Sequence, residues 1–356
     1  EKLKIKLIKR DGKKYIPKNG EEVEKIKELL DDHRYIVSDI VRKEIKRNPY
    51  PPYTTSTLQQ SANNVLGFSA KKTMTLAQML YQNGHITYMR TDSVYLADKA
   101  VKEIRKVIVD KYGKQYLPQK ERYYKNRTKN AQEAHEAIRP TDFSFDYSKL
   151  SSDEAKLYNL IWKRAVSSQM NSEVIENLNI YFQPDVKLEP EFTFSAVGQK
   201  VIFDGFRAAY GGINEDDSIQ KISQIKSGDI FTKEKFLTEQ KFTQPPARYT
   251  EASLVKKLES LGIGRPSTYA TIISTILDRK YVEREKKFLF PTDIGRVVIH
   301  FLEDNFTQLV DYQYTANVED GLDEIAKGKK KYVPFLDSQY KPLIKDIQNA
   351  EKKVKK

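Results

Sequence analysis

One tyrosine of the chain, Tyr88, has neighbouring residues that could make its hydroxyl group a nucleophile. In ITYMRTDS (86–93), Tyr88 and Arg90 are two positions apart, and side chains at that spacing on a β-strand point the same way. The pKa of a phenol is ordinarily about 10, and a nearby guanidinium favours the phenolate and can bind a phosphate. Asp92 follows in a Thr-Asp-Ser sequence that suits a turn or helix cap. The group could attack a phosphodiester and form a phosphotyrosine, or Tyr88 could be an ordinary half-buried strand residue.

A second group of polar residues, in AQEAHEAIRPTD (131–142), could also grip a phosphate. His135 and Arg139 are four positions apart, so they would share one face if this segment were helical. Pro140 would end such a helix. The other interpretation is a surface histidine near a helix end.

A third group lies in GIGRPSTYA (262–270). Ser267 and Thr268 are expected at the start of a helix, where free backbone N–H groups and the helix dipole attract anions. Arg265 lies just before that start and Arg279 at the far end, so the two arginines need not share a site. The same residues could form only a helix cap, because proline suits the first turn of a helix.

No pattern of metal ligands accompanies these groups. The four histidines, at positions 33, 85, 135 and 300, are scattered, and there is no glycine-rich phosphate loop. The chain has no cysteine, which excludes a disulfide framework, a cysteine zinc site and a thiol nucleophile. We therefore expect no metal site and no bound cofactor in this chain.

The charge of the chain points to a polyanionic partner. Its 356 residues include 62 Lys and Arg against 49 Asp and Glu, a net charge of +13, which makes nucleic acid the first candidate. With 39% hydrophobic and 31% charged residues, the chain can bury cores and should be soluble. No apolar run approaches the ~18 residues of a membrane span, so no membrane partner is expected.

The elements that must position these residues alternate along the chain. Residues 1–48 and 174–240 have the alternation of strands, whereas the chain from Thr54 and again over 241–350 has helical periodicity. Prolines in NPYPPY (48–53) mark the first change. One β domain interrupted by a helical insertion would explain this order, so we expect an α+β multidomain fold.

Four local predictions concern the neighbourhood of Tyr88. HITYMR (85–90) is expected to be a short strand, and KERYYKNRTKN (120–130) is expected to be a polar loop. Residues 93–113 and 151–170 are expected to be amphipathic helices, the second with a Ser/Asp/Glu capping signal. Tyr88 would then lie on a strand between helices.

Two segments, 56–90 and 252–283, repeat one pattern. In each, a helix ends in Leu-Gly-apolar, a short turn and a second helix follow, and a strand begins. The glycines suit left-handed C-caps. The plan is that of a helix-turn-helix with a wing, which KYVEREKKFLFP (280–291) would supply. A winged-helix DNA-binding protein without catalysis would account for the charge and the repeat, but it gives ITYMRTDS no purpose.

Together these segments resemble the type IA DNA topoisomerases, and among them bacterial topoisomerase I. The matching runs, in the family's order between residues 51 and 328, are PPYTTSTLQQSA, KKTMTLAQMLY, ITYMRTDS, EAHEAIRPTD, PPARYTEASLVKKLESLGIGRPSTYATIISTILDRKYV and DYQYTANVEDGLDEIAKG. The methionine before Arg90 resembles bacterial topoisomerase I more than its decatenating relatives.

The resemblance implies roles for the three groups. Tyr88 would be the nucleophile that forms a 5′-phosphotyrosine with one DNA strand, and Arg90 would support cleavage and position the scissile phosphate. The remaining positions would contact DNA: Asp92, His135, Arg139, Arg265, Ser267, Thr268 and Arg279. The complete enzyme would cleave one strand, pass another through and reseal, relaxing negatively supercoiled DNA.

The resemblance also implies a domain plan. Residues 1–48 and 175–238 would form a β-rich arch or gate domain, 49–174 an inserted helical domain carrying Tyr88, and 239–356 part of a helical, winged-helix-like base domain. The family's amino-terminal toprim domain, with its acidic Mg²⁺ cluster, and the carboxyl-terminal zinc ribbons have no counterpart in this sequence. We therefore expect a portion of a longer enzyme, with Mg²⁺ bound outside this chain.

The resemblance names partners and a compartment as well. They are single-stranded and negatively supercoiled DNA, and the toprim domain of the same polypeptide, in a monomeric, cytoplasmic, nucleoid-associated protein. A tyrosine recombinase or type IB enzyme is the rival that needs no metal, but those proteins place arginines and a histidine before a nucleophile near the carboxyl end. Here Tyr88 precedes His135 and Arg139.

Overall fold

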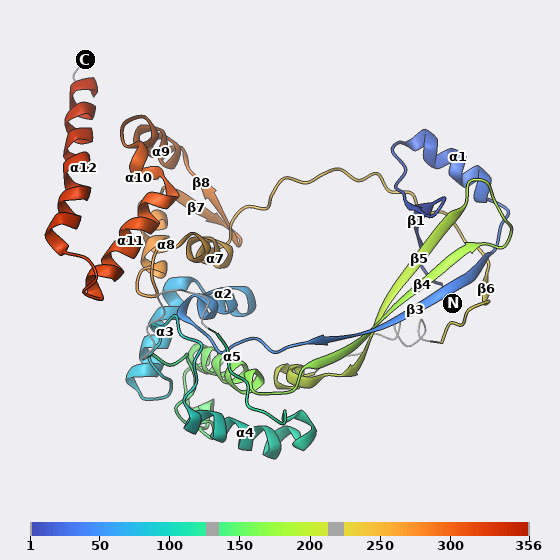
Figure 1. The fold of residues 1–356 in the computed structure, drawn as a ribbon, viewed down its shortest axis with the longest axis horizontal. Coiled ribbons are helices and arrows are strands. Elements are labelled where there is room, and N and C mark those ends of the chain that lie inside the picture. The colour runs from blue at the N-terminus through green and yellow to red at the C-terminus, as the bar shows by residue number, and fades with distance from the viewer. Residues whose placement is uncertain (1, 126–134, 213–223, 355–356) are drawn as a thin grey trace. The chain divides into compact units, whose positions relative to one another are not determined.

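The computed structural model describes residues 2–125, 135–212 and 224–354. By their contacts they form two compact units, which we take in turn (Figure 1). The first combines 1–49, 112–118 and 170–245, and the second combines 50–111, 119–169 and 246–356. Both helices and strands are present, and the α+β fold class is confirmed. The division into three domains stays a prediction.

The first unit is built on a six-stranded antiparallel sheet. Its strand order is β2-β1-β5-β4-β3-β6. Strand β3, which precedes the helical insertion, therefore pairs directly with β4, which follows it. The strands are β1 (Lys6–Arg10), β2 (Lys13–Lys14), β3 (Tyr35–Arg47), β4 (Glu173–Pro184), β5 (Phe192–Phe203) and β6 (Ile230–Phe231). Two short 3₁₀ helices, η1 (Lys114–Tyr116) and η3 (Gly205–Tyr210), belong to the same unit.

Helix α1 (Gly20–Leu30) lies beside the long strands of this sheet and packs on its core (Figure 1). Its N-cap Asn19 accepts a hydrogen bond from the Glu22 backbone N–H, and its Ile26 and Leu30 pack with buried residues of the long strands, including Phe182. Alternate residues of β4 are buried, as expected where one face of a sheet meets a core.

The second unit is mainly helical. Its helices are α2 (Thr55–Leu66), α3 (Ala70–Gln82), α4 (Asp98–Tyr112), α5 (Ser152–Ser168), α7 (Glu251–Leu261), α8 (Tyr269–Asp278), α9 (Asp293–Asn305), α10 (Thr307–Val310), α11 (Tyr312–Ala326) and α12 (Tyr332–Val354), with one 3₁₀ turn, η2 (Tyr147–Lys149). Strands β7 (Val282–Glu285) and β8 (Phe288–Pro291) form a hairpin. The predicted helix at 151–170 and the predicted wing are confirmed. The helices of the described residues are all too short or too polar to cross a lipid bilayer.

The two copies of the repeat begin and end alike. Thr54 and Thr250 cap α2 and α7 with capping boxes, and the helices end at glycines with left-handed backbone, Gly67 (φ 69°) and Gly262 (φ 73°). The predicted left-handed caps are confirmed. Corresponding helices of the two copies pack against each other: α2 contacts α7, and α3 contacts α8. Only the second copy continues into a strand, β7.

One predicted element near Tyr88 is wrong, and the helix considered for residues 131–142 is absent from the described part of that segment. Residues 85–90 are not a strand, because only Ile86 pairs, in an isolated bridge with Pro140. The described part of 131–142 is extended rather than helical, with Ile138 bridged to Tyr53. The tertiary pairing of the buried Ile138 outweighs local helix propensity, whereas the bridge of the buried Ile86 does not extend into a strand ladder.

The predicted helix at 93–113 begins later than expected, at Asp98. The Thr91 and Ser93 hydroxyls accept hydrogen bonds from the backbone N–H groups of Ser93 (3.0 Å) and Tyr95 (3.1 Å). Such side-chain bonds give the backbone an alternative to helix. The strand character expected up to residue 240 ends at β6, since residues 232–250 carry no regular element. Of the predicted loop at 120–130, residues 126–130 lie outside the described residues, as do 131–134.

Candidate functional site

Tyr88 and Arg90 present their side chains to solvent from an otherwise buried segment. Tyr88 is 42% exposed and Arg90 is exposed, whereas Met89 between them is 2% exposed. Within the described residues, neither the Tyr88 hydroxyl nor the Arg90 guanidinium has a hydrogen bond or an ion pair. Both groups are therefore free to meet a ligand.

The backbone on either side of Tyr88 is held by two threonine side chains. Thr55, the first residue of α2, is fully buried; its hydroxyl donates to the Met89 carbonyl oxygen (2.7 Å) and accepts from the Thr91 N–H (2.8 Å). The Thr87 hydroxyl donates to the Ala137 carbonyl oxygen (2.7 Å) and accepts from the Arg139 N–H (3.0 Å). The free side chains thus stand on a fixed backbone, as a preorganised site requires.

The Tyr88 ring has one aromatic neighbour that sequence reasoning did not single out. Tyr81, in the last turn of α3, meets it edge to face with ring centroids 5.2 Å apart. Tyr81 is itself 39% exposed. The available signal was only its spacing of seven positions before Tyr88 across a helix end, and among 22 tyrosines that is weak.

His135 and Arg139 do not share a helix face, because their segment is extended. The Arg139 guanidinium is 14% exposed and ion-paired with Glu136 (2.7 Å), and it also donates to the Pro140 carbonyl oxygen (2.9 Å). Glu136 in turn accepts from the Ala97 N–H (2.6 Å). His135 is half-buried. The DNA contacts expected of these two residues stay predictions.

The third group lies around α8 as expected. Thr268 is the N-cap of this helix, Ser267 before it is exposed, and Arg279 is the exposed C-cap. The Arg265 guanidinium is ion-paired with Asp320 and Asp323 of α11. Ten residues of helix separate Arg265 from Arg279 by roughly 15 Å, so the two arginines lie apart.

Asp92 connects the first group to the third. Burial raises the pKa of the Tyr269 phenol well above its ordinary value, and the negative charges of Glu259 and Asp92 raise it further. Tyr269 is the first residue of α8 and is 6% exposed. The Tyr88 segment and the start of α8 are thus close enough for their charges to interact.

Glu251 is a second residue that the sequence reasoning missed. It is 3% exposed, accepts from the Ala70 N–H at the start of α3 (2.7 Å) and is ion-paired with Arg284 of β7. In the sequence it looks like an acidic residue of a first helical turn, so nothing marked its contacts with α3 and with the wing.

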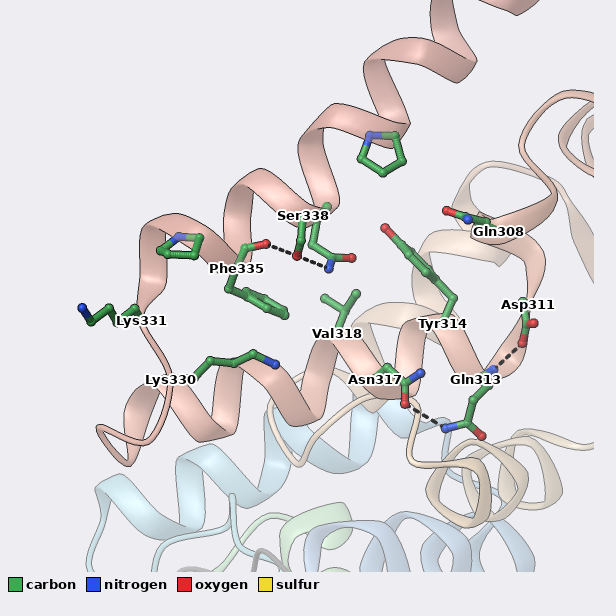
Figure 2. A pocket seen from close by; sticks show the side chains of 13 residues that line it. Gln308, Asp311, Gln313, Tyr314, Asn317, Val318, Lys330, Lys331, Phe335 and Ser338 are labelled. Carbon is green, nitrogen blue, oxygen red and sulfur yellow. Dashed lines mark hydrogen bonds between the residues drawn. The ribbon is translucent and has the colours of Figure 1, made fainter.

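A groove among the described residues lies apart from all of these side chains. It has a volume of about 840 Å³ in the angle between α11 and α12, where Figure 2 shows Val318 and Phe335 facing one another. None of the predicted site residues lines it. In the described part of the chain, no three His, Asp or Glu side chains converge to hold a metal ion.

The chain is similar to known topoisomerases over nearly its whole length. The DNA topoisomerase family matches residues 2–337. DNA topoisomerase 1 of Xylella fastidiosa (strain Temecula1) is 43% identical over 373 residues, covering 97% of this chain and 45% of the relative. That of Streptomyces coelicolor is 46% identical over 320 residues, covering 87% of this chain and 34% of the relative.

A solved structure also places this chain among the topoisomerases. Full-length topoisomerase I from Thermotoga maritima matches with a TM-score of 0.76 and 34% identity, covering 94% of this chain and 55% of that one. The chain thus spans about half the length, or less, of the relatives it matches. From its sequence and its fold, the chain belongs to the DNA topoisomerase family, within the bacterial type IA topoisomerase I group.

Proposed function

We propose that this chain carries the strand-cleaving tyrosine of a DNA topoisomerase that relaxes negatively supercoiled DNA. The Tyr88 oxygen attacks a phosphodiester of a single strand and forms a 5′-phosphotyrosine. The 3′ oxygen leaves and takes up a proton, the phenol having lost one. Attack by the freed 3′ hydroxyl reverses the step after strand passage. The observation that carries the proposal is that the Tyr88 hydroxyl is exposed, stands on a fixed backbone and has no hydrogen-bond partner among the described residues.

Arg90 supports this step by its charge and geometry. It is exposed like Tyr88, and its guanidinium can hold two oxygens of the scissile phosphate while stabilising the negative charge that develops there. The proposed DNA contacts are Asp92, His135, Arg139, Ser267, Thr268 and Arg279. With a net charge of +13, the chain should bind single-stranded DNA in a strongly salt-dependent way.

The magnesium ion expected of the whole enzyme does not fit the described residues, since no group of three acidic or histidine side chains there is arranged to hold a metal ion. The resemblance assigns it to a toprim domain. We accordingly expect relaxation of supercoiled DNA to require that ion.

The test is relaxation of a negatively supercoiled plasmid by the whole enzyme. Tyr88→Phe, which removes only the nucleophilic oxygen, should abolish relaxation while leaving DNA binding intact. Tyr95→Phe is the matched control, because Tyr95 is similarly exposed, at 45%, and lies seven positions further on. Relaxation that survives Tyr88→Phe would refute the assignment and favour a winged-helix protein that only binds DNA.

A further inference from the structure

The Arg265 side chain has all of its N–H groups engaged by protein oxygens. A guanidinium carries five N–H donors. Nη1 donates to the carbonyl oxygens of Gly262 (3.1 Å) and Gly264 (3.0 Å). Nη2 donates to Asp320 (3.1 Å) and Asp323 (3.0 Å), and Nε donates to Asp323 (3.2 Å). A phosphate could reach this guanidinium only by displacing one of these acceptors.

The charge around Arg265 also disfavours a phosphate. Besides the two aspartates, the Glu319 carboxylate lies 3.9 Å from Nε. Three carboxylates of α11 therefore surround one cation, and their excess negative charge would repel a phosphate. These ion pairs suit a structural role in which Arg265 joins the turn before α8 to α11.

The main chain of Arg265 shapes the turn that leads into α8. Its N–H donates to the Thr268 hydroxyl (2.8 Å), and its carbonyl oxygen accepts from the Thr268 N–H (2.8 Å). These bonds close a loop with Ser267 exposed at its edge. Through its side chain, Arg265 ties that loop to α11.

We propose that Arg265 is a positioning residue, which holds the Ser267–Thr268 turn, with its exposed Ser267, on α11 for DNA and does not itself contact a phosphate. The inference rests on the proposed function, because it concerns how a DNA-contacting turn is held. It also reassigns Arg265, which the resemblance places among the DNA ligands.

The first experiment neutralises the acceptors. Asp320→Asn with Asp323→Asn is compared with Asp304→Asn with Asp337→Asn, which removes the same charge from exposed positions of α9 and α12. Affinity for a fluorescein-labelled oligothymidylate is measured by anisotropy over a series of NaCl concentrations, well below each variant's unfolding midpoint. A purely stabilising role would leave that affinity unchanged.

The two roles of Arg265, positioning the turn and contacting a phosphate directly, predict opposite changes in DNA affinity for the Asp320/Asp323 variant. If Arg265 positions the turn, the Asp320/Asp323 variant binds about fivefold more weakly than the control, the equivalent of one hydrogen bond, although it has lost negative charge. Tighter binding than the control would overturn the proposal, because the carboxylates would then have been withholding a phosphate ligand. Equal binding would overturn it as well.

The second experiment changes Arg265 itself and decides the matter if the double variant does not fold. Arg265→Gln should weaken binding without altering the slope of log affinity against log salt, and Arg265→Lys should weaken it as much, because an ammonium cannot reproduce the five-donor fork. A slope lower by about one, or binding largely preserved by Lys, would identify a phosphate contact. If the wild-type chain bound no DNA, the proposed function would fail, and this inference with it.

Discussion

At the scale of single residues, the candidate site combines free side chains with a tightly bonded backbone. Tyr88 and Arg90 could be identified as candidate site residues from the sequence, because their residue types and their spacing of two positions are visible there. The partners of Arg139 and Arg265 could be read only in part. Glu136 is near in sequence, but the acceptors on α11 lie more than fifty positions beyond Arg265, and no periodicity connects them.

Thr55 gives the most direct test of this backbone support. Thr55→Val keeps the shape but leaves the buried Thr91 N–H without its acceptor, which should cost about 1–3 kcal/mol in free energy of unfolding. It should also slow strand cleavage by the whole enzyme more than it weakens DNA binding. Denaturant unfolding and single-turnover cleavage measure the two effects.

The control for that variant is Thr75→Val. The Thr75 hydroxyl donates to the Lys71 carbonyl oxygen on an exposed part of α3 (3.0 Å), so its loss should change stability and cleavage little. Cleavage at the wild-type rate in Thr55→Val would show that the threonine bridge does not position Tyr88.

At the scale of elements, helices with local signals were predictable and isolated bridges were not. The caps at Thr54 and Thr250, the left-handed glycines and the β7–β8 hairpin all follow from nearby residues. The segment around Tyr88 instead takes its shape from one isolated bridge, between Ile86 and Pro140, and from the hydrogen bonds of Thr55, which are all distant in sequence. Hydrophobic periodicity within a short stretch of sequence cannot predict pairing with such distant residues.

Glu251 should couple the two repeat copies energetically. Glu251→Gln removes the charge that pairs with Arg284 while retaining an acceptor for the Ala70 N–H, and we expect a loss of about 1–3 kcal/mol in unfolding free energy. Glu24→Gln is the control, since Glu24 forms an exposed pair with Lys27 and should contribute less than about 1 kcal/mol. Equal losses in the two variants would contradict the coupling.

The sheet unit should respond to alkali through Tyr35. Burial, with a smaller contribution from Asp31, raises the pKa of Tyr35 to about 12. Below pH 10 its phenol is neutral in both states and its contribution to stability is complete. As the pH rises from 10 towards 12, the unfolded state ionises first, so about 2–3 kcal/mol should be lost.

Tyr35→Phe tests that loss. The variant lacks the ionisable group but keeps a ring to pack edge to face on Phe194. Its unfolding free energy should fall less steeply between pH 10 and 12 than that of the wild type. Parallel curves would mean that Tyr35 ionises alike in both states.

At the scale of the whole molecule, the chain is basic and spans about half, or less, of its relatives. Composition alone indicated a polyanionic partner, and family membership narrows the proposed partner to DNA. The three sequence-predicted groups all belong to the second compact unit, where the copies of the repeat pack against each other. The proposed chemistry therefore concentrates in this unit, while the sheet unit contains none of the predicted site residues.

The central claim is that Tyr88 becomes covalently linked to a 5′ phosphate. The most direct measurement uses the whole enzyme and a single-stranded oligonucleotide labelled at either its 3′ or its 5′ end, followed by denaturing electrophoresis and mapping of the modified peptide. The account predicts that only the 3′ label is transferred, that it is found on Tyr88, and that Tyr88→Phe abolishes transfer. Transfer of the 5′ label, as for a recombinase or type IB enzyme, or transfer to another residue, would contradict it.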